Sequence, residues 1–340
     1  MNIKKIGLTA LAGSLVATTA FAGELSISGA AKFSYKSLDG TANRVGASAG
    51  TTGTGMDTAS PFAMDQDISA AGSAELDNGM TISVSHGLTS TGGASDTSSL
   101  TLAMGDMGSL KYSDTDISGG LKALDDKMPS AYEEVTDGTG AVQAAMANGA
   151  GFSWGSSIGG AAVSIAYSDN YGATTNRSDG SEDTTAAGAS SSSSIGIQYP
   201  VADTGLTVFG GVGTEGQADT TEIDHNTIGV KYAYGPVTLG YQVNDEDNSA
   251  ADNTVAADED LETTSYGVSF MVNDSLSISY GEHTTTSTAT GAVDQELEGI
   301  AISYSMGGMT ISAYDHDGTS MSNVSGTNSE AQEILVTFAF

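Results

Sequence analysis

The sequence has 340 residues, no cysteine, and 42 acidic residues against 10 basic ones, which gives a net charge of −32 at pH 7. Such a charge repels nucleic acid and attracts cations, so we expect no nucleic-acid partner. The absence of cysteine from the sequence excludes disulfide frameworks and thiolate metal sites.

Residues 1–22 have the layout of a secretory signal peptide. Two lysines precede a short apolar stretch, and small residues surround Phe21 at its end. The alternative is a membrane anchor, but the stretch is shorter than the roughly 20 apolar residues that a spanning helix requires. We expect cleavage between Ala22 and Gly23, which leaves residues 23–340 with 8 basic and 42 acidic residues and a net charge of −34.

Apolar and polar residues alternate through most of the remaining chain. In "ELSISGAAKFSYK", residues 24–36, the odd positions hold Leu25, Ile27, Ala31, Phe33 and Tyr35 with Gly29 among them, and the serines and lysines take even positions, which predicts a strand with one apolar and one polar face. The same period recurs in fifteen further stretches, near residues 67–76, 80–84, 100–104, 110–112, 150–156, 163–167, 195–199, 206–212, 228–234, 237–243, 266–272, 276–280, 300–306, 309–313 and 334–340. Turns such as "DNG" at 77–79 alternate with long segments rich in Ser, Thr, Asp and Gly.

Two architectures use strands of this kind. A soluble sandwich or propeller buries the apolar faces, whereas a transmembrane barrel turns them toward lipid. The apolar faces of this chain contain no charged residue, and their aromatic residues, mostly tyrosine, often lie at strand ends, as an interfacial girdle requires. We therefore predict an all-β fold, a 16-stranded antiparallel transmembrane β-barrel with short periplasmic turns, long external loops and an aqueous interior.

The last stretch, "ILVTFAF", places Ile334, Val336, Phe338 and Phe340 on one face. A barrel in lipid leaves no strand edge unpaired, so we expect this strand to pair with the first one.

At this point the chain resembles the general porins of the Gram-negative outer membrane, closest to the alphaproteobacterial type. The resemblance is carried by the signal peptide, by "ELSISGAAKFSY", by "ISGGLKALDDKMPSAYEE" at 117–134 and by the strand ending in Phe340. It implies a homotrimer in the outer membrane that lets small hydrophilic solutes and ions diffuse passively, in contact with lipid and lipopolysaccharide. It also implies that Phe340 is a signal for the barrel-assembly machinery.

Porins of this family fold a third external loop into the barrel, and the matching segment here is residues 114–148. By resemblance, carboxylates of this loop form the acidic side of a constriction: Asp114, Asp116, Asp125, Asp126, Glu133, Glu134 and Asp137. The expected basic side on the barrel wall comprises only Lys32, Lys36 and Lys111, because arginine clusters are absent and both mature arginines fall in loops. Uncompensated carboxylates concentrate cations, so we predict a cation-preferring pore. The alternative is that these carboxylates belong to a solvated loop outside the pore.

Other site chemistries have weaker patterns. Asp315 and Asp317 in "DHDG" resemble part of a calcium loop without its full spacing, so we expect no cofactor, with weak Ca²⁺ or Mg²⁺ binding at external loops as the alternative. No nucleophile elbow or phosphate-binding loop points to an enzyme, and a hydrolase built on a barrel is the remaining catalytic alternative. An acidic, calcium-binding structural or adhesive β protein is the competing class, but a solenoid of that kind needs a short fixed repeat that we do not find.

Overall fold

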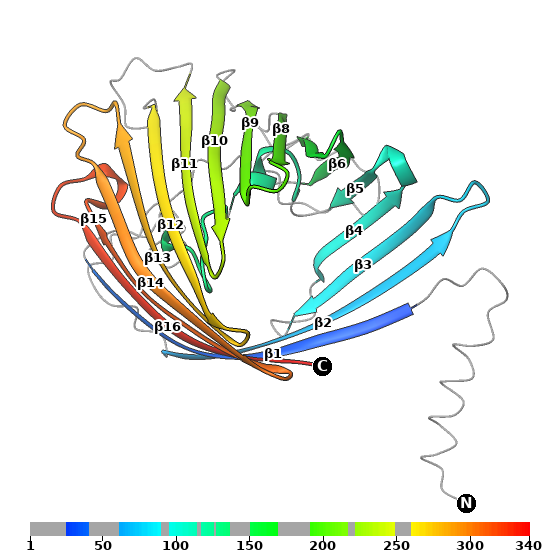
Figure 1. Cartoon of the computed structure of the whole chain (residues 1–340), viewed down its shortest axis with the longest axis horizontal. Coiled ribbons are helices and arrows are strands. Elements are labelled where there is room, and N and C mark those ends of the chain that lie inside the picture. The colour runs from blue at the N-terminus through cyan, green and yellow to red at the C-terminus, as the bar shows by residue number, and fades with distance from the viewer. Residues whose placement is uncertain are drawn as a thin grey trace, which may run out of the picture.

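A computed structural model of the chain describes residues 25–40, 61–89, 95–113, 117–125, 127–136, 150–168, 191–216, 222–248 and 260–340. These residues form sixteen strands in one closed barrel, in which β1 (Leu25–Gly40) pairs antiparallel with both β2 (Phe62–Glu75) and β16 (Asn328–Ala339) (Figure 1). The predicted 16-stranded antiparallel barrel is confirmed, and a solenoid is excluded. The expected cleavage site between Ala22 and Gly23 lies outside the described residues.

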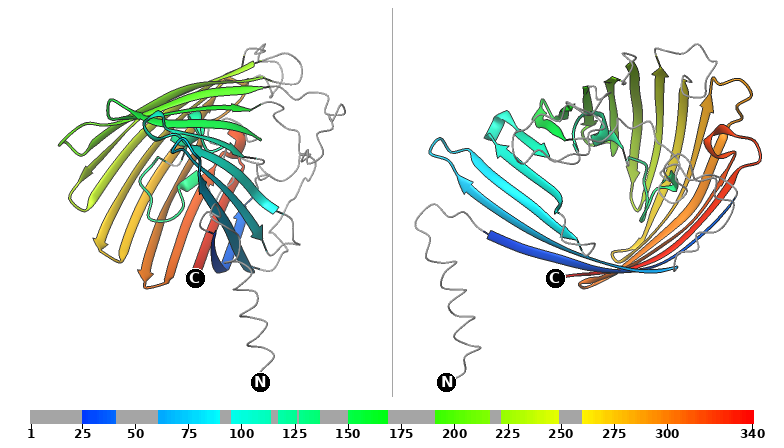
Figure 2. Two further views of the ribbon diagram at one scale, coloured as in Figure 1. Left: turned by 90° about the vertical axis from the view of Figure 1, so that its right-hand side faces the viewer. Right: turned by 180° about the vertical axis from the view of Figure 1, so that it is seen from behind.

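Each strand pairs with its neighbours in sequence, and the strands run obliquely around the barrel (Figure 2). The others are β3 (Thr81–Thr89), β4 (Ser95–Ala103), β5 (Ser109–Ser113), β6 (Gly151–Ile158), β7 (Ala161–Ser168), β8 (Ser192–Pro200), β9 (Leu206–Gly216), β10 (Glu222–Tyr234), β11 (Val237–Asn248), β12 (Leu261–Asn273), β13 (Leu276–Ser287), β14 (Gln295–Met306) and β15 (Met309–Thr319). Short 3₁₀ turns occur at η1 (Gly105–Met107), η2 (Gly120–Leu124) and η3 (Met321–Asn323). Among the described residues, no helix has the length and hydrophobicity needed to span a membrane.

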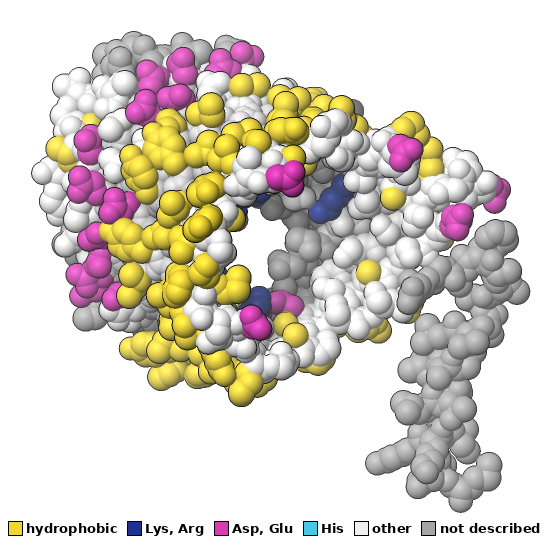
Figure 3. Space-filling view, in the orientation of Figure 1, with side chains coloured by type: hydrophobic (Ala, Val, Ile, Leu, Met, Phe, Trp, Pro, Cys, Tyr) yellow, Lys and Arg dark blue, Asp and Glu magenta, His cyan; other side chains and the backbone are white. Residues whose placement is uncertain are grey.

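The alternation of side chains explains the arrangement of the barrel wall. In β12, Tyr266 and Phe270 are exposed on the outside, whereas Thr263 and Ser265 are buried on the inside. Other strands repeat this pattern, so apolar side chains cover broad parts of the outer surface (Figure 3). A fold that is apolar outside and polar inside is suited to lipid around it and water within it.

Turn chemistry fixes the short connections. In the predicted "DNG" turn, Gly79 has φ +81°, a conformation that glycine adopts without strain, and its amide donates to the Leu76 carbonyl at 2.9 Å. The Asn78 side-chain oxygen accepts the Met80 amide at 3.1 Å. Such turns hold consecutive strands in antiparallel register at one end of the barrel.

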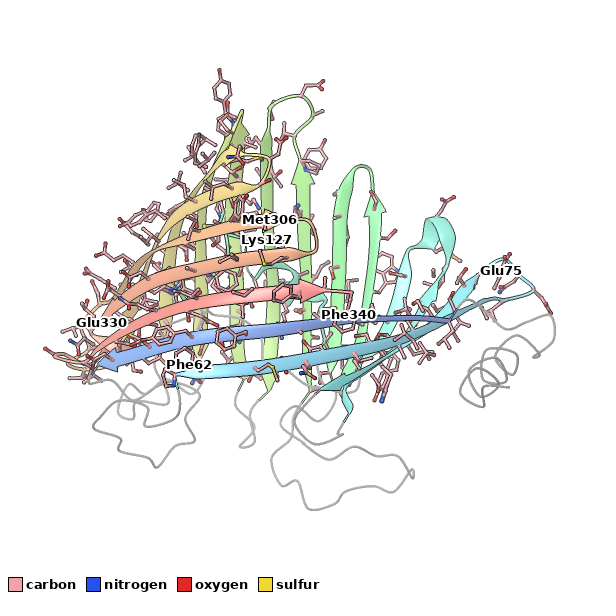
Figure 4. The ribbon with its side chains drawn as sticks, turned by 90° about the horizontal axis from the view of Figure 1, so that it is seen from below. Phe62, Glu75, Lys127, Met306, Glu330 and Phe340 are labelled. Atoms are coloured by element: carbon pink, nitrogen blue, oxygen red, sulfur yellow. The ribbon has the colours of Figure 1, made fainter. Side chains whose placement is uncertain are left out.

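The barrel closes between the first and last strands. The Gly29 amide donates to the Phe340 carbonyl at 2.9 Å, and the Phe340 amide donates to the Gly29 carbonyl at 3.0 Å. Phe340 lies at one end of β16, with Glu330 toward the other end of the strand (Figure 4). The prediction that the terminal strand pairs with the first is therefore confirmed by the register from Ala30 opposite Ala339 to Gly40 opposite Ser329.

Candidate functional site

A stretch of chain between β5 and β6 lies inside the barrel, against its inner wall (Figures 1 and 2). We call its described residues, 117–125 and 127–136, the inner segment. Three wall serines accept hydrogen bonds from its backbone. The Gly120 amide donates to Ser164 Oγ on β7 at 2.9 Å, and the Leu121 amide donates to Ser194 Oγ on β8 at 3.0 Å. The Ala131 amide donates to Ser279 Oγ on β13 at 2.9 Å, so the segment follows the wall from β7 to β13.

Apolar side chains hold the inner segment to the wall. Leu121, Leu124 and Met128 form a buried cluster with Phe209 of β9, which points into the barrel. Further along, the ring of Tyr132 stacks on Tyr314 of β15 with 6.0 Å between centroids. Burial of each such side chain contributes about 1.5–3 kcal/mol, so the segment is a packed part of the fold.

Three of the predicted acidic constriction residues belong to the inner segment as described. Asp125 follows η2, and Glu133 and Glu134 follow the Ser130 turn, in which Ser130 Oγ donates to the Glu133 carbonyl at 2.6 Å. Asp125 and Glu133 are partly buried, and Glu134 is buried. Four others, Asp114, Asp116, Asp126 and Asp137, lie outside the described residues. The place of all seven carboxylates at a constriction stays a prediction.

The predicted basic residues face the lumen from two parts of the wall. Lys32 Nζ lies 3.0 Å from Asp67 Oδ2 and 4.0 Å from Asp65 Oδ2, both on the neighbouring strand β2.

Lys36 Nζ lies 3.8 Å from Glu333 Oε2 on β16 and 5.8 Å from the centre of the Tyr314 ring. Lys111 Nζ donates to Ser118 Oγ of the inner segment at 3.4 Å. The lysines of β1 are therefore paired with carboxylates of the wall itself.

Asp65, Asp67 and Glu333 were missed by the sequence analysis. The predicted strands began near 67 and 334, whereas β2 begins at Phe62 and β16 at Asn328. Asp67 already lies on the polar face of the predicted strand, and extending the alternation to the observed starts places Asp65 and Glu333 on the lumen face as well, so the signal was present in the sequence.

Within the described residues, lumen-facing carboxylates outnumber lysines. The lysines on the lumen face of the wall or on the inner segment are Lys32, Lys36, Lys111, Lys122, Lys127 and Lys231. The carboxylates in the same positions are Asp65, Asp67, Glu75, Asp125, Glu133, Glu134, Glu215, Glu246 and Glu333. The lumen is thus lined by both signs of charge with an acidic excess.

Asp315 and Asp317 point away from the lumen. Asp317 lies opposite Glu298 of β14 and Glu330 of β16 in the strand register. No group of three or more His, Cys, Asp or Glu side chains among the described residues is arranged to hold a metal ion. Weak divalent-cation binding at Asp315 and Asp317 stays a prediction.

A closed barrel with an apolar exterior, a charged and polar lumen, and an open passage beside the inner segment defines a transmembrane diffusion channel (Figure 3). A model of the Gram-negative porin family matches residues 7–317. The chain therefore belongs to the Gram-negative porin family, and the resemblance expected from the sequence is confirmed. It forms a passive channel in the outer membrane.

Solved porin structures are similar along nearly the whole chain. A porin refined at 1.8 Å resolution shares 16% identity with a TM-score of 0.66, covering 93% of this chain and 100% of that one. An anion-selective porin from Comamonas acidovorans shares 12% identity with a TM-score of 0.63, covering 94% of this chain and 100% of that one. OmpT, an outer membrane protein of Vibrio cholerae, shares 10% identity with a TM-score of 0.63, covering 94% of this chain and 98% of that one. No curated protein matches the chain.

Proposed function

We propose that this porin prefers cations over anions. The observation that supports the proposal is the pairing of the β1 lysines with wall carboxylates, two beside Lys32 and one beside Lys36. Carboxylates within 4.0 Å of a lysine offset its positive charge. The paired lysine therefore repels cations only weakly and attracts anions only weakly. The inner segment adds Asp125, Glu133 and Glu134 to the same lumen.

Selectivity must be decided by such charges, because the fold alone does not set it. One of the structural neighbours is described as anion-selective, although it has the same architecture at a TM-score of 0.63. The reversal potential across a planar lipid bilayer with a KCl gradient tests the proposal directly. A potential of the sign produced by K⁺ permeation supports it, and one of the opposite sign overturns it.

Removing one carboxylate from the inner segment should weaken the preference. Asp125→Asn is expected to lower the ratio of K⁺ to Cl⁻ permeability by roughly two- to sevenfold, because a unit charge roughly 7 Å from an ion changes the energy of that ion by about 0.6 kcal/mol in a water-like medium, with opposite sign for K⁺ and Cl⁻, and salt screening reduces the change. Reversal potentials of the two channels measure the change.

Asp317→Asn provides the matched control for that measurement. It removes the same charge from the outside of β15, so the permeability ratio is expected to stay near that of the unmodified channel. Equal losses in both variants would show that overall charge, and not the inner segment, sets the selectivity.

We also infer that the chain assembles as a homotrimer that contacts lipid and lipopolysaccharide, an inference supported by its membership of the Gram-negative porin family. The mass of the protein purified in detergent, measured by analytical ultracentrifugation with the bound detergent subtracted, is expected to equal three chains. A mass of one chain under mild detergent conditions would contradict the assembly.

A further inference from the structure

Four lumen-facing glycines form a row across neighbouring strands. In the strand register Gly240 of β11 lies opposite Gly267 of β12, which lies opposite Gly281 of β13, which lies opposite Gly299 of β14. Glycine inside a strand weakens it, and it often marks a place where another chain segment approaches the backbone closely. A row of four therefore calls for a structural reason.

The inner segment occupies the space that side chains at two of these positions would fill. A Cβ atom on Gly240 would clash with Pro129 Cδ and would lie 3.0 Å from Met128 Sδ. A Cβ atom on Gly267 would lie 2.8 Å from Pro129 Cδ and 3.1 Å from Met128 Cβ. Carbon atoms in contact are normally 3.5–4.0 Å apart, so Met128 and Pro129 fit against the wall only because both side chains are absent.

The other two glycines of the row are different. At Gly281 an added Cβ would lie 3.6 Å from both the Tyr266 carbonyl oxygen and Val135 Cγ1, which are ordinary contacts. At Gly299 the space is taken by the ring of His316, which belongs to the wall. Of the four glycines, only Gly240 and Gly267 contact the inner segment so closely that a side chain would not fit. We call these two glycines the seat of the segment.

The segment is fixed on both sides of this seat. Upstream, the Gln242 side-chain amide donates to the Leu124 carbonyl at 3.4 Å, and downstream the Ala131 amide donates to Ser279 Oγ at 2.9 Å. Between these anchors Met128 and Pro129 are buried against the lumen-facing side of β11 and β12. A side chain added at the seat would push these residues into the lumen.

We propose that Gly240 and Gly267 determine the width of the pore, and hence the size of the solutes that pass, by letting the inner segment lie flush with the barrel wall. This role rests on the channel activity of the family and is independent of the proposed cation preference. Solute size is limited by the narrowest cross-section, so a shift of the segment by about 1 Å narrows the passage for ions and for sugars.

Single-channel conductance of Gly240→Ala, Gly240→Val and Gly267→Ala tests the proposal, with Gly281→Ala as the matched control from the same row. We expect a conductance lower by roughly a quarter for the alanine variants and by about half for the valine variant, because current follows the free cross-section. Gly281→Ala should keep its conductance. Swelling of proteoliposomes in sugars of increasing size should slow most for the largest sugar.

A rescue variant separates narrowing from misfolding. Pro129→Ala removes the atom that an added Cβ would meet, so Gly240→Ala combined with Pro129→Ala should recover most of the lost conductance. Heat-modifiable gel mobility identifies the folded barrels, and if Gly240→Val does not assemble, the alanine variants decide the question. Unchanged or larger conductance in folded Gly240→Ala and Gly267→Ala, or an equal loss in Gly281→Ala, would overturn the proposal. The reversal potential in the same recordings reports ion preference separately.

Discussion

Ile302→Lys should lower the free energy of unfolding by about 2–4 kcal/mol, the cost of a lysine that faces lipid near the middle of a bilayer. Ile302 is 43% exposed on the outside of β14, between Ile278 of β13 and Ala313 of β15 in the register. The ammonium group lies among apolar side chains without water, and the outward carboxylate of Asp315 lies opposite Ile300, two residues away along β14. Urea titration of the protein folded into lipid vesicles measures the loss, and the single tryptophan, Trp154, reports unfolding by its fluorescence.

Ser303→Lys is the control for this prediction, because the neighbouring residue faces the lumen. Ser303 Oγ lies 3.1 Å from Ser312 Oγ of β15 on the inner wall, where an added ammonium group reaches water. Its cost is expected to be below about 1 kcal/mol, within the range of substitutions on a solvated surface. If the two lysines cost the same, the assignment of the outer and inner faces would be wrong.

The fold was predictable because its main determinant is local. A barrel in lipid needs an apolar side chain at every second position, and β12 follows this rule from Tyr266 to Phe270 with serine and glycine between. The order of the strands required no further information, since short turns make consecutive strands neighbours. The errors lie at strand ends. The first residues of β16, Asn328 to Glu333, lack strong apolar character, whereas β2 begins with Phe62 and Met64, whose alternation extends the predicted strand.

The site was less predictable because its contacts join distant parts of the chain. Phe209 and Tyr314 break the rule that polar residues face the lumen, and both do so where the inner segment packs. Nothing near Phe209 in the sequence indicates that its partner is Leu121. The seat at Gly240 depends likewise on the register of β11 and β12 and on the path of the segment.

Net charge overstates the field inside the pore. Many carboxylates at one end of the barrel face outward, and in β13–β16 they lie opposite one another, as Glu282, Glu298, Asp317 and Glu330 do. Tyr280 on the outer wall donates its hydroxyl to both Glu282 and Glu298, at 2.7 and 2.9 Å. The described lysines, in contrast, all belong to the lumen face or the inner segment. Ions inside the barrel therefore meet a much smaller acidic excess than the net charge of −32, and we expect the cation preference to be moderate.

Deletion of Phe340 should reduce the amount of porin in the outer membrane by about tenfold, while the channels that do insert keep their conductance. The deletion removes both hydrogen bonds with Gly29 that close this end of the β1–β16 pair. The inner segment contacts the wall elsewhere, so the passage is not expected to change. A loss of two backbone hydrogen bonds costs about 1–3 kcal/mol, which is too little to unfold a barrel with complete pairing along the rest of both strands.

Two single substitutions distinguish an assembly signal from simple lipid packing. Phe340→Ala and Phe338→Ala each remove an outward aromatic ring from the same end of β16, with 77% and 48% of the two residues exposed, and each leaves the backbone pairing intact. The Phe340 ring also covers Gly29, where an added Cβ would lie 2.6 Å from Phe340 Cε2. If Phe340 is read by the assembly machinery, Phe340→Ala lowers outer-membrane levels several-fold more than Phe338→Ala. The levels are measured by immunoblot of outer-membrane fractions. Equal levels of the two variants would contradict the assembly signal and would show that Phe340 acts only as a lipid-facing residue of the closing strand.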